Sequence, residues 1–366
     1  MSKEEAKELR RGWTTGACAT AAAKAAYAAL LTGTFPDPVE ITLPKGATTA
    51  FALTRHALSE ESASATITKD AGDDPDVTHG ALITSTLRLL PKGSGVRFKA
   101  GDGVGMVTRP GLPIPPGEPA INPVPRQMMQ AAIQEVATIF GVTGDVEIEV
   151  SIEGGAELAQ KTMNPRLGII GGLSVLGTTG IVRPFSCAAW IASIHRGIDV
   201  ARAIGLTHVV GATGASSEDA VRTRYGLDET AFLDMGDFAG GLLKYLRSHP
   251  VEKLTLAGGF AKFTKLAQGA LDLHSARSSV DFGFLQELLR EAGASASLIE
   301  GAASANTAKE VLDRALAEGI DLAAPLARRT REAVRQILRA APVDVEVLIT
   351  DRKGNILGEC GFDGTG

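Results

Sequence analysis

Cysteine is scarce in this sequence: a chain of 366 residues has only three, at Cys18, Cys187 and Cys360. They lie far apart and are odd in number, which excludes a disulfide framework. No two of them have the close spacing of a two-cysteine zinc knuckle. We therefore expect neither a disulfide-stabilised fold nor a zinc module of that kind.

Aromatic residues, positive net charge and long apolar runs are also missing. Phe, Trp and Tyr make up 5% of the residues, which argues against a protein that stacks bases along a single strand. The formal net charge of -5 argues against nonspecific nucleic-acid binding, which needs a basic field. No apolar run is long enough to span a membrane, and the opening MSKEEAKELRRG has no apolar signal region. We expect a soluble, cytoplasmic protein that binds neither nucleic acid nor a membrane.

Proline, by contrast, is concentrated in one place. Residues 107–126, VTRPGLPIPPGEPAINPVPR, hold seven of the seventeen prolines. Because proline fixes φ and lacks an N–H, we expect this segment to be neither helix nor interior strand. It can be a semi-rigid linker, a polyproline ligand or a stiff loop over a site, and its position inside the first domain counts against a linker.

The length favours two domains, of which residues 1–155 have mixed α+β character. Thr14 or Thr15 can cap a helix over residues 17–31, and Gly33 can end it. Strands are predicted at 39–43, 49–58 and 62–70, and in GVRFKAG and DVEIEVSI. A second helix is predicted from beyond Pro125 to about Phe140.

Residues 156–366 have the alternating pattern of a parallel sheet flanked by helices. Short apolar runs with glycine are predicted as strands in LGIIGG, THVVGATG, TAFLDMGD and KLTLAGG, with helices between them at 185–204, 216–225, 237–248 and 260–272. A helical tail follows at 282–292, 306–317 and 323–340, then a hairpin turning at Lys353-Gly354-Asn355. The fold class is therefore α/β, with an N-terminal α+β domain and a C-terminal α/β domain whose sheet is mainly parallel.

Glycine-bearing turns lie where this sheet would bind a ligand, beyond the carboxyl ends of its strands. The turns are Gly171-Gly172, 211–214, 234–237 and Gly258-Gly259. They could hold a nucleotide-like cofactor, with Asp234 or Asp237 bonding a ribose hydroxyl. The candidate cofactor residues are Gly211, Thr213, Gly214, Ser216, Asp234, Gly236, Gly258 and Gly259. Ordinary tight turns explain the same glycines, and neither a Walker A sequence nor a complete GxGxxG is present.

An acidic loop, KDAGDDPDVTHG, gathers the candidate catalytic residues Asp73, Asp74, Asp76 and His79. Clustered carboxylates can hold a hard cation or raise one another's pKa, so that one of them acts as a general acid or base. The spacing does not match a calcium loop. An ordinary turn accounts for the same composition.

Arginine next to proline recurs four times, at Arg109, Arg126, Arg166 and Arg183. Guanidinium groups rooted on stiff backbone suit the recognition of carboxylate or phosphate, so these residues predict a small polyanionic ligand. The other candidate substrate residues are Thr178, Thr179, Lys262, Lys265 and His274. A helix-end cap is the alternative role for His274.

Taken together, these stretches resemble the cobalt-precorrin-5B (C1)-methyltransferase family of anaerobic cobalamin biosynthesis, the CbiD family. The resemblance rests on GWTTGACATAAAKAA, the acidic loop, GVGMVTRPGLPIPPGEPAINPVPRQM, NPRLGIIGGLSVLGTTGIVRPFS, GATGASSE and GGFAKFTKLAQGALDLHS. It covers residues 11 to about 280, is weaker beyond residue 300, and departs mildly from the family at TGASSE.

The resemblance implies an S-adenosylmethionine-dependent enzyme that methylates C1 of a cobalt-containing tetrapyrrole. Such a substrate carries many carboxylates, which the rigid arginines would bind, and the proline-rich segment would be a stiff wall or lid. Cobalt would arrive with the substrate, so we expect no metal site of the protein's own; a homodimer is compatible with the sequence. A non-catalytic tetrapyrrole carrier and an NAD(P)-dependent oxidoreductase of the same pathway are the alternatives.

Overall fold

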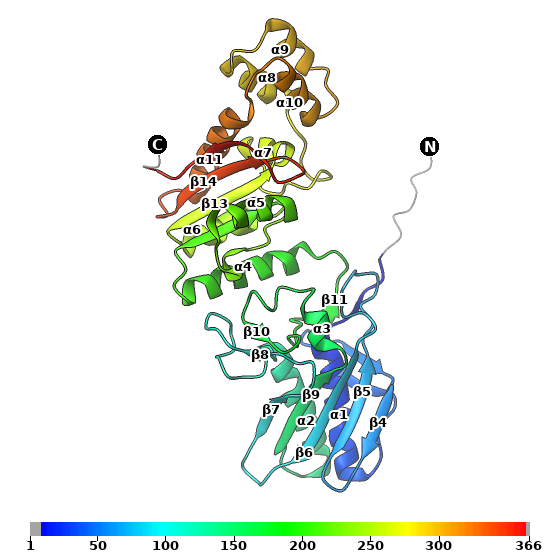
Figure 1. Ribbon diagram of the computed structural model, residues 1–366. Coiled ribbons are helices and arrows are strands. Elements are labelled where there is room, and N and C mark those ends of the chain that lie inside the picture. Colours follow the sequence, from blue (N-terminus) through cyan, green and yellow to red (C-terminus); the bar gives the residue numbers. More distant parts are fainter. Residues whose placement is uncertain (1–8, 364–366) are drawn as a thin grey trace, which may run out of the picture. The chain divides into compact units, whose positions relative to one another are not determined.

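The computed structural model describes residues 9–363, and the chain divides into two compact units, Met1–Cys187 and Ala188–Gly366 (Figure 1). The division lies beyond residue 155, where the change in sequence pattern predicts a boundary. The physical reason is strand pairing: residues 169–170 and 181–182 pair with strands of the first unit.

The first unit is built on a five-stranded sheet in the order β4-β5-β6-β9-β7. Its strands are β4 (Arg55–Leu58), β5 (Ala63–Thr68), β6 (Leu82–Leu89), β7 (Val96–Ala100) and β9 (Val146–Ile152). Only the β7–β9 pair is parallel. Two helices, α1 (Thr15–Thr32) and α2 (Pro123–Phe140), pack against each other, and α1 packs on β5 and β6.

Small residues allow α1 to lie very close to the sheet. Its nine alanines leave little side chain between backbones, and the Ser85 hydroxyl of β6 donates to the Ala19 carbonyl at 2.9 Å. The Thr14 hydroxyl accepts from the Ala17 amide as the N-cap, and Gly33 ends the helix at φ 77°. Both ends of α1 therefore form as the sequence predicts, with one or two residues more than expected.

The remaining elements of the first unit are short. They are β1 (Gly12–Trp13), β2 (Val39–Thr42), β3 (Thr48–Phe51), β8 (Met106–Val107), α3 (Gly155–Ala159), β10 (Ile169–Ile170) and β11 (Ile181–Val182). β1 pairs with β11, β8 with β10, and β2 with β3, all antiparallel.

The second unit has a four-stranded sheet in the order β12-β13-β14-β15, and its first three strands are parallel. The strands are β12 (His208–Ala212), β13 (Lys253–Gly259), β14 (Asp344–Thr350) and β15 (Ile356–Cys360). The helices are α4 (Cys187–Ala203), α5 (Ala215–Tyr225), the short 3-10 helix η1 (Glu229–Ala231), α6 (Ala239–Ser248), α7 (Phe260–Ala267), α8 (Phe282–Glu291), α9 (Ala296–Ala302), α10 (Ala308–Ala317) and α11 (Ala323–Leu338).

Alternate residues of each strand face the two sides of this sheet. Val209, Leu256 and Val347 join a core with α4, α6, α7 and α11, whereas Val210 and Leu348 join a smaller core with α5. The sheet is therefore covered by helices on both faces, as the predicted α/β class requires.

Several predicted elements are wrong in detail. Ile169–Ile170 is not a strand of the parallel sheet but pairs with β8. Residues 231–237 make one bridge to β12, between Val210 and Phe232, because Asp234 at φ 46° and Gly236 at φ 56° turn the chain. The run 49–58 is two strands, the helix at 260–272 ends at Ala267, and strand β6 and helix α9 were not anticipated.

At its end the proline-rich segment is helical, contrary to prediction, because Pro123 and Pro125 begin helix α2. Proline is compatible with the first turn of a helix because the amide it lacks has no partner there. Among residues 9–363, no helix is long and apolar enough to cross a membrane.

Candidate functional site

Four segments far apart in the sequence meet at one end of the first unit. The Trp13 amide donates to the Asp70 carbonyl, the Thr14 amide to Gly180, and the Gly16 amide to Leu176. The first turn of α1 is thus held between the acidic loop and residues 176–180. The Asn122 amide in turn donates to Val175, so the proline-rich segment ends at the same place. Most candidate residues predicted for the first unit lie on or next to these segments; Arg126 lies in the first turn of α2, and Arg166 lies in the turn before β10.

In the acidic loop, most of the carboxylates are bound by neighbouring groups. Arg10 forms an ion pair with Asp70, and this hydrogen bond, with one from the Gly72 amide, lowers the pKa of Asp70 to about 2. Asp73 accepts from the Arg10 amide at 2.7 Å. Asp74 accepts from the Phe185 amide at 2.8 Å, and Phe185 has the strained φ of 54°. These contacts join the loop to both ends of the unit's chain.

Asp76 is paired with a buried lysine. The Lys69 side chain is 1% exposed, and its ammonium contacts Asp76 and the Thr78 hydroxyl. Burial alone would raise the pKa of Asp76, but the charge of Lys69 and the hydrogen bonds from Lys69 and Thr78 lower it. Asp76 is therefore held ionised by a structural partner.

The ring of His79 is fixed by a backbone hydrogen bond, because its Nδ1 accepts from the Ala71 amide at 3.1 Å. In the neutral ring the proton then lies on Nε2. His79, whose side chain is 53% exposed, thus offers solvent a donor rather than a lone pair.

The proline-rich segment is held by hydrogen bonds to its own residues and to Gly168. The Thr108 amide and hydroxyl both donate to Gly168, and the Val107 amide donates to Glu118. The Arg126 side chain binds the same segment: its Nε donates to the Ile121 carbonyl at 2.8 Å, and a terminal nitrogen contacts the Glu118 carboxylate and the Pro119 carbonyl.

The predicted arginines have different surroundings. Arg126 binds the proline-rich segment, and its guanidinium lies 5.2 Å from the centre of the Phe98 ring. The stem of Arg109 packs against Gly168, where a Cβ would come within 2.6 Å of it, and Arg166 is half-buried in the following loop. Arg183 is exposed, and within residues 9–363 its guanidinium has no hydrogen bond or ion pair. Thr178 is also exposed, and the Thr179 hydroxyl bonds to the backbone of Ile181.

In the second unit, the carboxyl end of β12 is a topological switch point. The chain leaves β12 through α5 on one face of the sheet, makes the parallel bridge of Phe232 to Val210, and returns to β13 through α6 on the other face, where α7 also lies. Helices α5 and α7 start directly at the ends of these neighbouring strands, with Gly214 and Gly259 as their N-caps. A ligand of this sheet is expected at such a crevice.

The candidate glycines divide into filled and open positions. A Cβ on Gly211 would come within 2.5 Å of Leu242, and one on Gly258 within 2.5 Å of Phe263. Gly236 is covered by the ring of Trp190. A Cβ on Gly214 or Gly259 would meet nothing within 4 Å. Only these last two of the five candidate glycines therefore leave open space.

Charged groups of α7 and of the loop before α6 lie near the carboxyl ends of β12 and β13. Lys262 donates to the Thr213 carbonyl at 3.0 Å and lies 3.0 Å from Asp237 Oδ1. That oxygen is buried, and the Lys262 ammonium is its charged partner.

The contacts of Lys265 and His274 indicate structural roles. Lys265 is buried and its ammonium donates to the Leu273 and Ser278 carbonyls; burial lowers its pKa. His274 is exposed, and its Nδ1 accepts from the Ala276 amide at 3.2 Å, as a cap would.

Trp190 contacts the 234–237 turn but is not among the site residues predicted from the sequence. It is 45% exposed on α4, and its indole N–H donates to the Asp234 carbonyl at 2.8 Å. A single aromatic in a predicted helix is indistinguishable from a core residue, so only its scarcity, one of two tryptophans, could have marked it.

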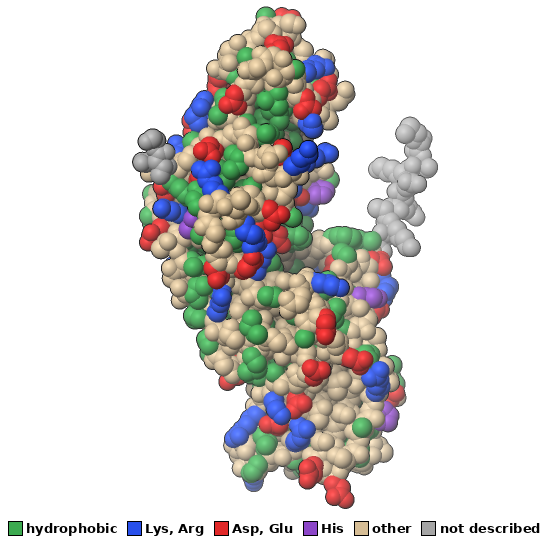
Figure 2. Space-filling view, viewed as in Figure 1, with side chains coloured by type: hydrophobic (Ala, Val, Ile, Leu, Met, Phe, Trp, Pro, Cys, Tyr) green, Lys and Arg blue, Asp and Glu red, His purple; other side chains and the backbone are tan. Residues whose placement is uncertain are grey.

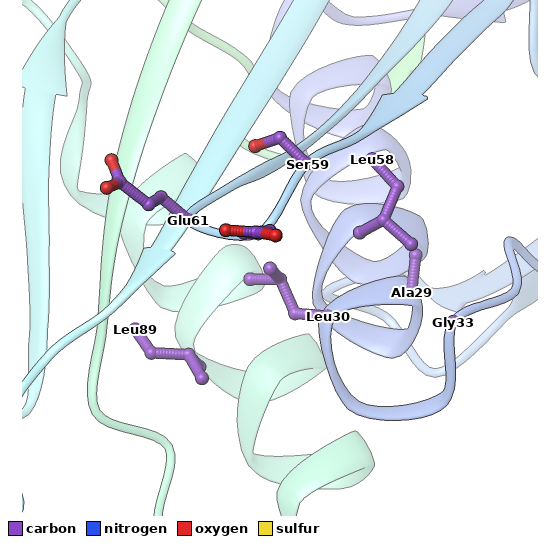
Figure 3. A pocket seen from close by; sticks show the side chains of 8 residues that line it. Ala29, Leu30, Gly33, Leu58, Ser59, Glu61 and Leu89 are labelled. Atoms are coloured by element: carbon purple, nitrogen blue, oxygen red, sulfur yellow. The ribbon is translucent and has the colours of Figure 1, made fainter.

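Cavities in the structure overlap only in part with the predicted site residues. One of about 420 Å³ at the end of α1 is lined by Leu30, Leu58 and Leu89 with Glu60 and Glu61 (Figure 3). Its two carboxylates and lack of a lining cation make it unsuited to a polyanion. Another, of about 350 Å³, lies between α5 and the turn before β15 and includes Ser216, Arg224 and Lys353.

On one face of the molecule, charge by itself does not mark a site. On the face shown in Figure 2, basic and acidic side chains are interspersed. Within residues 9–363, no three His, Cys, Asp or Glu side chains are grouped to hold a metal ion.

Comparison with known proteins gives consistent matches over both units. The family model described as CbiD matches residues 2–184, and the one described as CbiD, C-terminal domain, matches residues 272–361. The cobalt-precorrin-5B C(1)-methyltransferase of Brucella canis is 62% identical over 353 residues, 96% of this chain and 96% of that protein. The protein of the same name from Brucella anthropi is 61% identical over 354 residues, 97% of this chain and 96% of that protein.

A solved structure also matches, the cobalamin biosynthesis protein (cbiD) of Archaeoglobus fulgidus. It is 24% identical, with a TM-score of 0.39 over 78% of this chain and 85% of that chain. From the family model and the Brucella relatives, this chain belongs to the CbiD family.

Proposed function

We propose that this protein methylates C1 of cobalt-precorrin-5B with S-adenosylmethionine, giving cobalt-precorrin-6A in cobalamin biosynthesis. The observation that carries the proposal is the 62% identity, over 96% of the chain, to curated proteins named as this methyltransferase. That name implies a methyl donor; S-adenosylmethionine is our assignment of it.

The open glycines support a donor site at the switch point of the second unit. Gly214 and Gly259 leave room at the ends of two adjacent strands, and amides of the first turns of α5 and α7 are available there for the donor's carboxylate. The Asp237 carboxylate, whose Oδ1 lies 3.0 Å from the Lys262 ammonium, is an acceptor that suits a ribose hydroxyl. The donor supplies a methyl group on a positively charged sulfur, and the protein's task is to align it and exclude water.

Arg183 is our candidate for binding the substrate's carboxylates in the first unit. It is exposed beside a stiff proline, and its donors have no partner among the described residues. Arg126, whose donors hold the proline-rich wall, acts on the wall's rigidity instead. A preformed wall lowers the ordering cost of binding.

If a proton must leave the ring, Asp73 or Asp74 would accept it. Each uses only one oxygen in a backbone hydrogen bond. Asp76 is paired with Lys69, and His79 offers Nε2–H, so we assign to these two residues support of the loop and hydrogen-bond donation.

The test is an assay with purified protein, cobalt-precorrin-5B and S-adenosylmethionine labelled in its methyl group. We expect the label in the product at C1, located by NMR. Arg183→Ala should raise the KM for the tetrapyrrole about tenfold, the loss of one charged hydrogen bond, with unchanged affinity for the donor. Lys161→Ala, which removes an exposed cation elsewhere in the unit, is the control.

Other outcomes lead to other functions. Tetrapyrrole binding with neither methyl transfer nor any response to S-adenosylmethionine would indicate a carrier. Nicotinamide binding at the same edge would favour the oxidoreductase. A weakened donor affinity in Arg183→Ala would reverse our assignment of that residue.

A further inference from the structure

We propose that Trp190, with Phe238 and Arg277, forms the surface of the second unit that supports the tetrapyrrole ring during methyl transfer. The inference rests on the proposed function and adds positioning residues to it. It depends on how the indole is held, on what surrounds it and on the shape of the ligand.

The indole of Trp190 is exposed although its helix buries other apolar residues. Ile194 and Ile198 of α4 are fully buried in the core, whereas Trp190 is 45% exposed. A large aromatic side chain left in solvent forgoes much of the free energy that burial would provide. An isolated exposed residue needs no explanation, but one that is fixed in place does.

Trp190 is fixed by two contacts on residues with unusual backbone. Its Nε1 donates to the Asp234 carbonyl at 2.8 Å, and its ring lies 3.5–3.8 Å from the position of a Cβ on Gly236. Asp234 has φ 46°, in a region that non-glycine residues rarely adopt. The turn thus aims the carbonyl at the indole and lets the ring lie against a glycine. Such strain is typical of functional sites.

The surroundings combine aromatic and cationic groups. The Phe238 ring lies 6.0 Å from that of Trp190 at 50°, and the Arg277 guanidinium lies 5.7 Å from the Phe238 centroid. Arg277 contacts Asp272 at 2.5 Å, which fixes its orientation while leaving part of the side chain exposed. Lys262 of α7 lies 3.0 Å from Asp237, the residue before Phe238.

A broad ring with carboxylates around its rim matches this combination. Its flat face can stack on the indole, and its carboxylates can reach a guanidinium. Adenine also stacks, but it carries no anionic group for Arg277. The match to both aromatic and cationic groups therefore favours the tetrapyrrole over the donor's base.

The experiment uses the full chain with Trp190→Leu and the milder Trp190→Phe. Binding of uroporphyrin, a tetrapyrrole with carboxylates around its rim, and of S-adenosylmethionine is measured by calorimetry, followed by KM and kcat for methyl transfer. We expect Trp190→Leu to weaken uroporphyrin binding and raise the tetrapyrrole KM about tenfold, as expected for loss of one aromatic stack. Trp190→Phe should retain part of the affinity, and donor affinity should not change.

Phe140→Leu is the matched control, since Phe140 is an aromatic residue 47% exposed at the end of α2. It should leave both affinities unchanged. Weaker donor binding with normal uroporphyrin binding would overturn the proposal in favour of an adenine surface, and unchanged binding of both would leave the indole a structural role. Failure of the proposed function would show instead as wild-type protein that does not methylate, whatever Trp190 does to uroporphyrin binding.

Discussion

At the scale of single residues, the ion pair of Lys69 and Asp76 shows how a loop that looks catalytic can be structural. Lys69 is 1% exposed, so its charge depends on Asp76 and the Thr78 hydroxyl. Removing one partner of a buried pair leaves an uncompensated charge, which costs about 3 kcal/mol or more. Asp76→Asn should therefore lower the free energy of unfolding by about 3 kcal/mol at neutral pH, measured by urea denaturation.

The pH dependence of the same variant checks the cause. The folded protein lowers the pKa of Asp76, so the unfolded chain binds its proton first as the pH falls. The stabilisation is thus complete above the unfolded pKa, near 3.9, and is lost as the pH falls through the folded value. The wild type and Asp76→Asn should converge in acid. Lys69→Met with Asp76→Asn should recover stability at neutral pH; no recovery would mean that the pair is not the reason.

Only part of this could be predicted from residue types. The Thr14 cap and the Gly33 stop depend on neighbours within four residues, and both form as predicted. The partners of Asp74 and Asp76 depend on tertiary folding: Phe185 is 111 positions away, and Lys69 becomes buried only when the loop closes over it. An acidic cluster in sequence therefore does not reveal which of its members are free.

At the scale of elements, the glycines that begin α5 and α7 separate packing from binding. Gly211→Ala would place a Cβ 2.5 Å from Leu242, and overpacking of this kind costs about 1–3 kcal/mol. Gly214→Ala and Gly259→Ala meet nothing within 4 Å, and their φ angles of 168° and -71° suit alanine. Their unfolding free energies should stay within about 0.5 kcal/mol of the wild type.

Donor affinity should be affected in the variants whose stability is unchanged, and unaffected in the variant that is destabilised. We expect Gly214→Ala and Gly259→Ala to weaken S-adenosylmethionine about tenfold by calorimetry, because the methyl group occupies the proposed donor space. Gly211→Ala should bind normally wherever it is folded. Normal donor binding in both edge variants would place the donor elsewhere on the chain.

Elements were predictable where a local pattern specifies them. The hairpin β14–β15 turns at Lys353-Gly354-Asn355, as its residues indicate, with the Asp351 carboxylate accepting from the Lys353 and Asn355 amides. Strand β6 was missed because its sequence LITSTLRL mixes polar and apolar residues, and its buried Ser85 is explained only by the contact with α1. Residues 231–237 have a strand-like composition, but the backbone at Asp234 and Gly236 ends the pairing after one bridge.

At the scale of the whole molecule, the α/β class followed from the alternation of short strands and helices, but the division between units did not. Residues 169–170 resemble a strand of the second unit by composition, and their pairing with β8 assigns them to the first. Nothing local distinguishes a two-residue antiparallel strand from the start of a parallel one. Long-range pairing therefore decides where a unit ends.

Because each unit has its own core, a ligand that binds one of them should stabilise that one. The large core of the second unit contains residues between Ile194 and Cys360, and that of the first contains residues between Ala17 and Val175. S-adenosylmethionine at about 100 times its Kd stabilises the state it binds by about 2.7 kcal/mol. Hydrogen exchange should therefore slow in β12, β13, α5 and α7 and stay unchanged in α1 and β5. Protection of the acidic loop and α1 instead, with none at β12, would move the donor site to the first unit. At the same concentration the Gly214→Ala variant, with its tenfold weaker binding, should be stabilised by only about 1.4 kcal/mol and show correspondingly weaker protection.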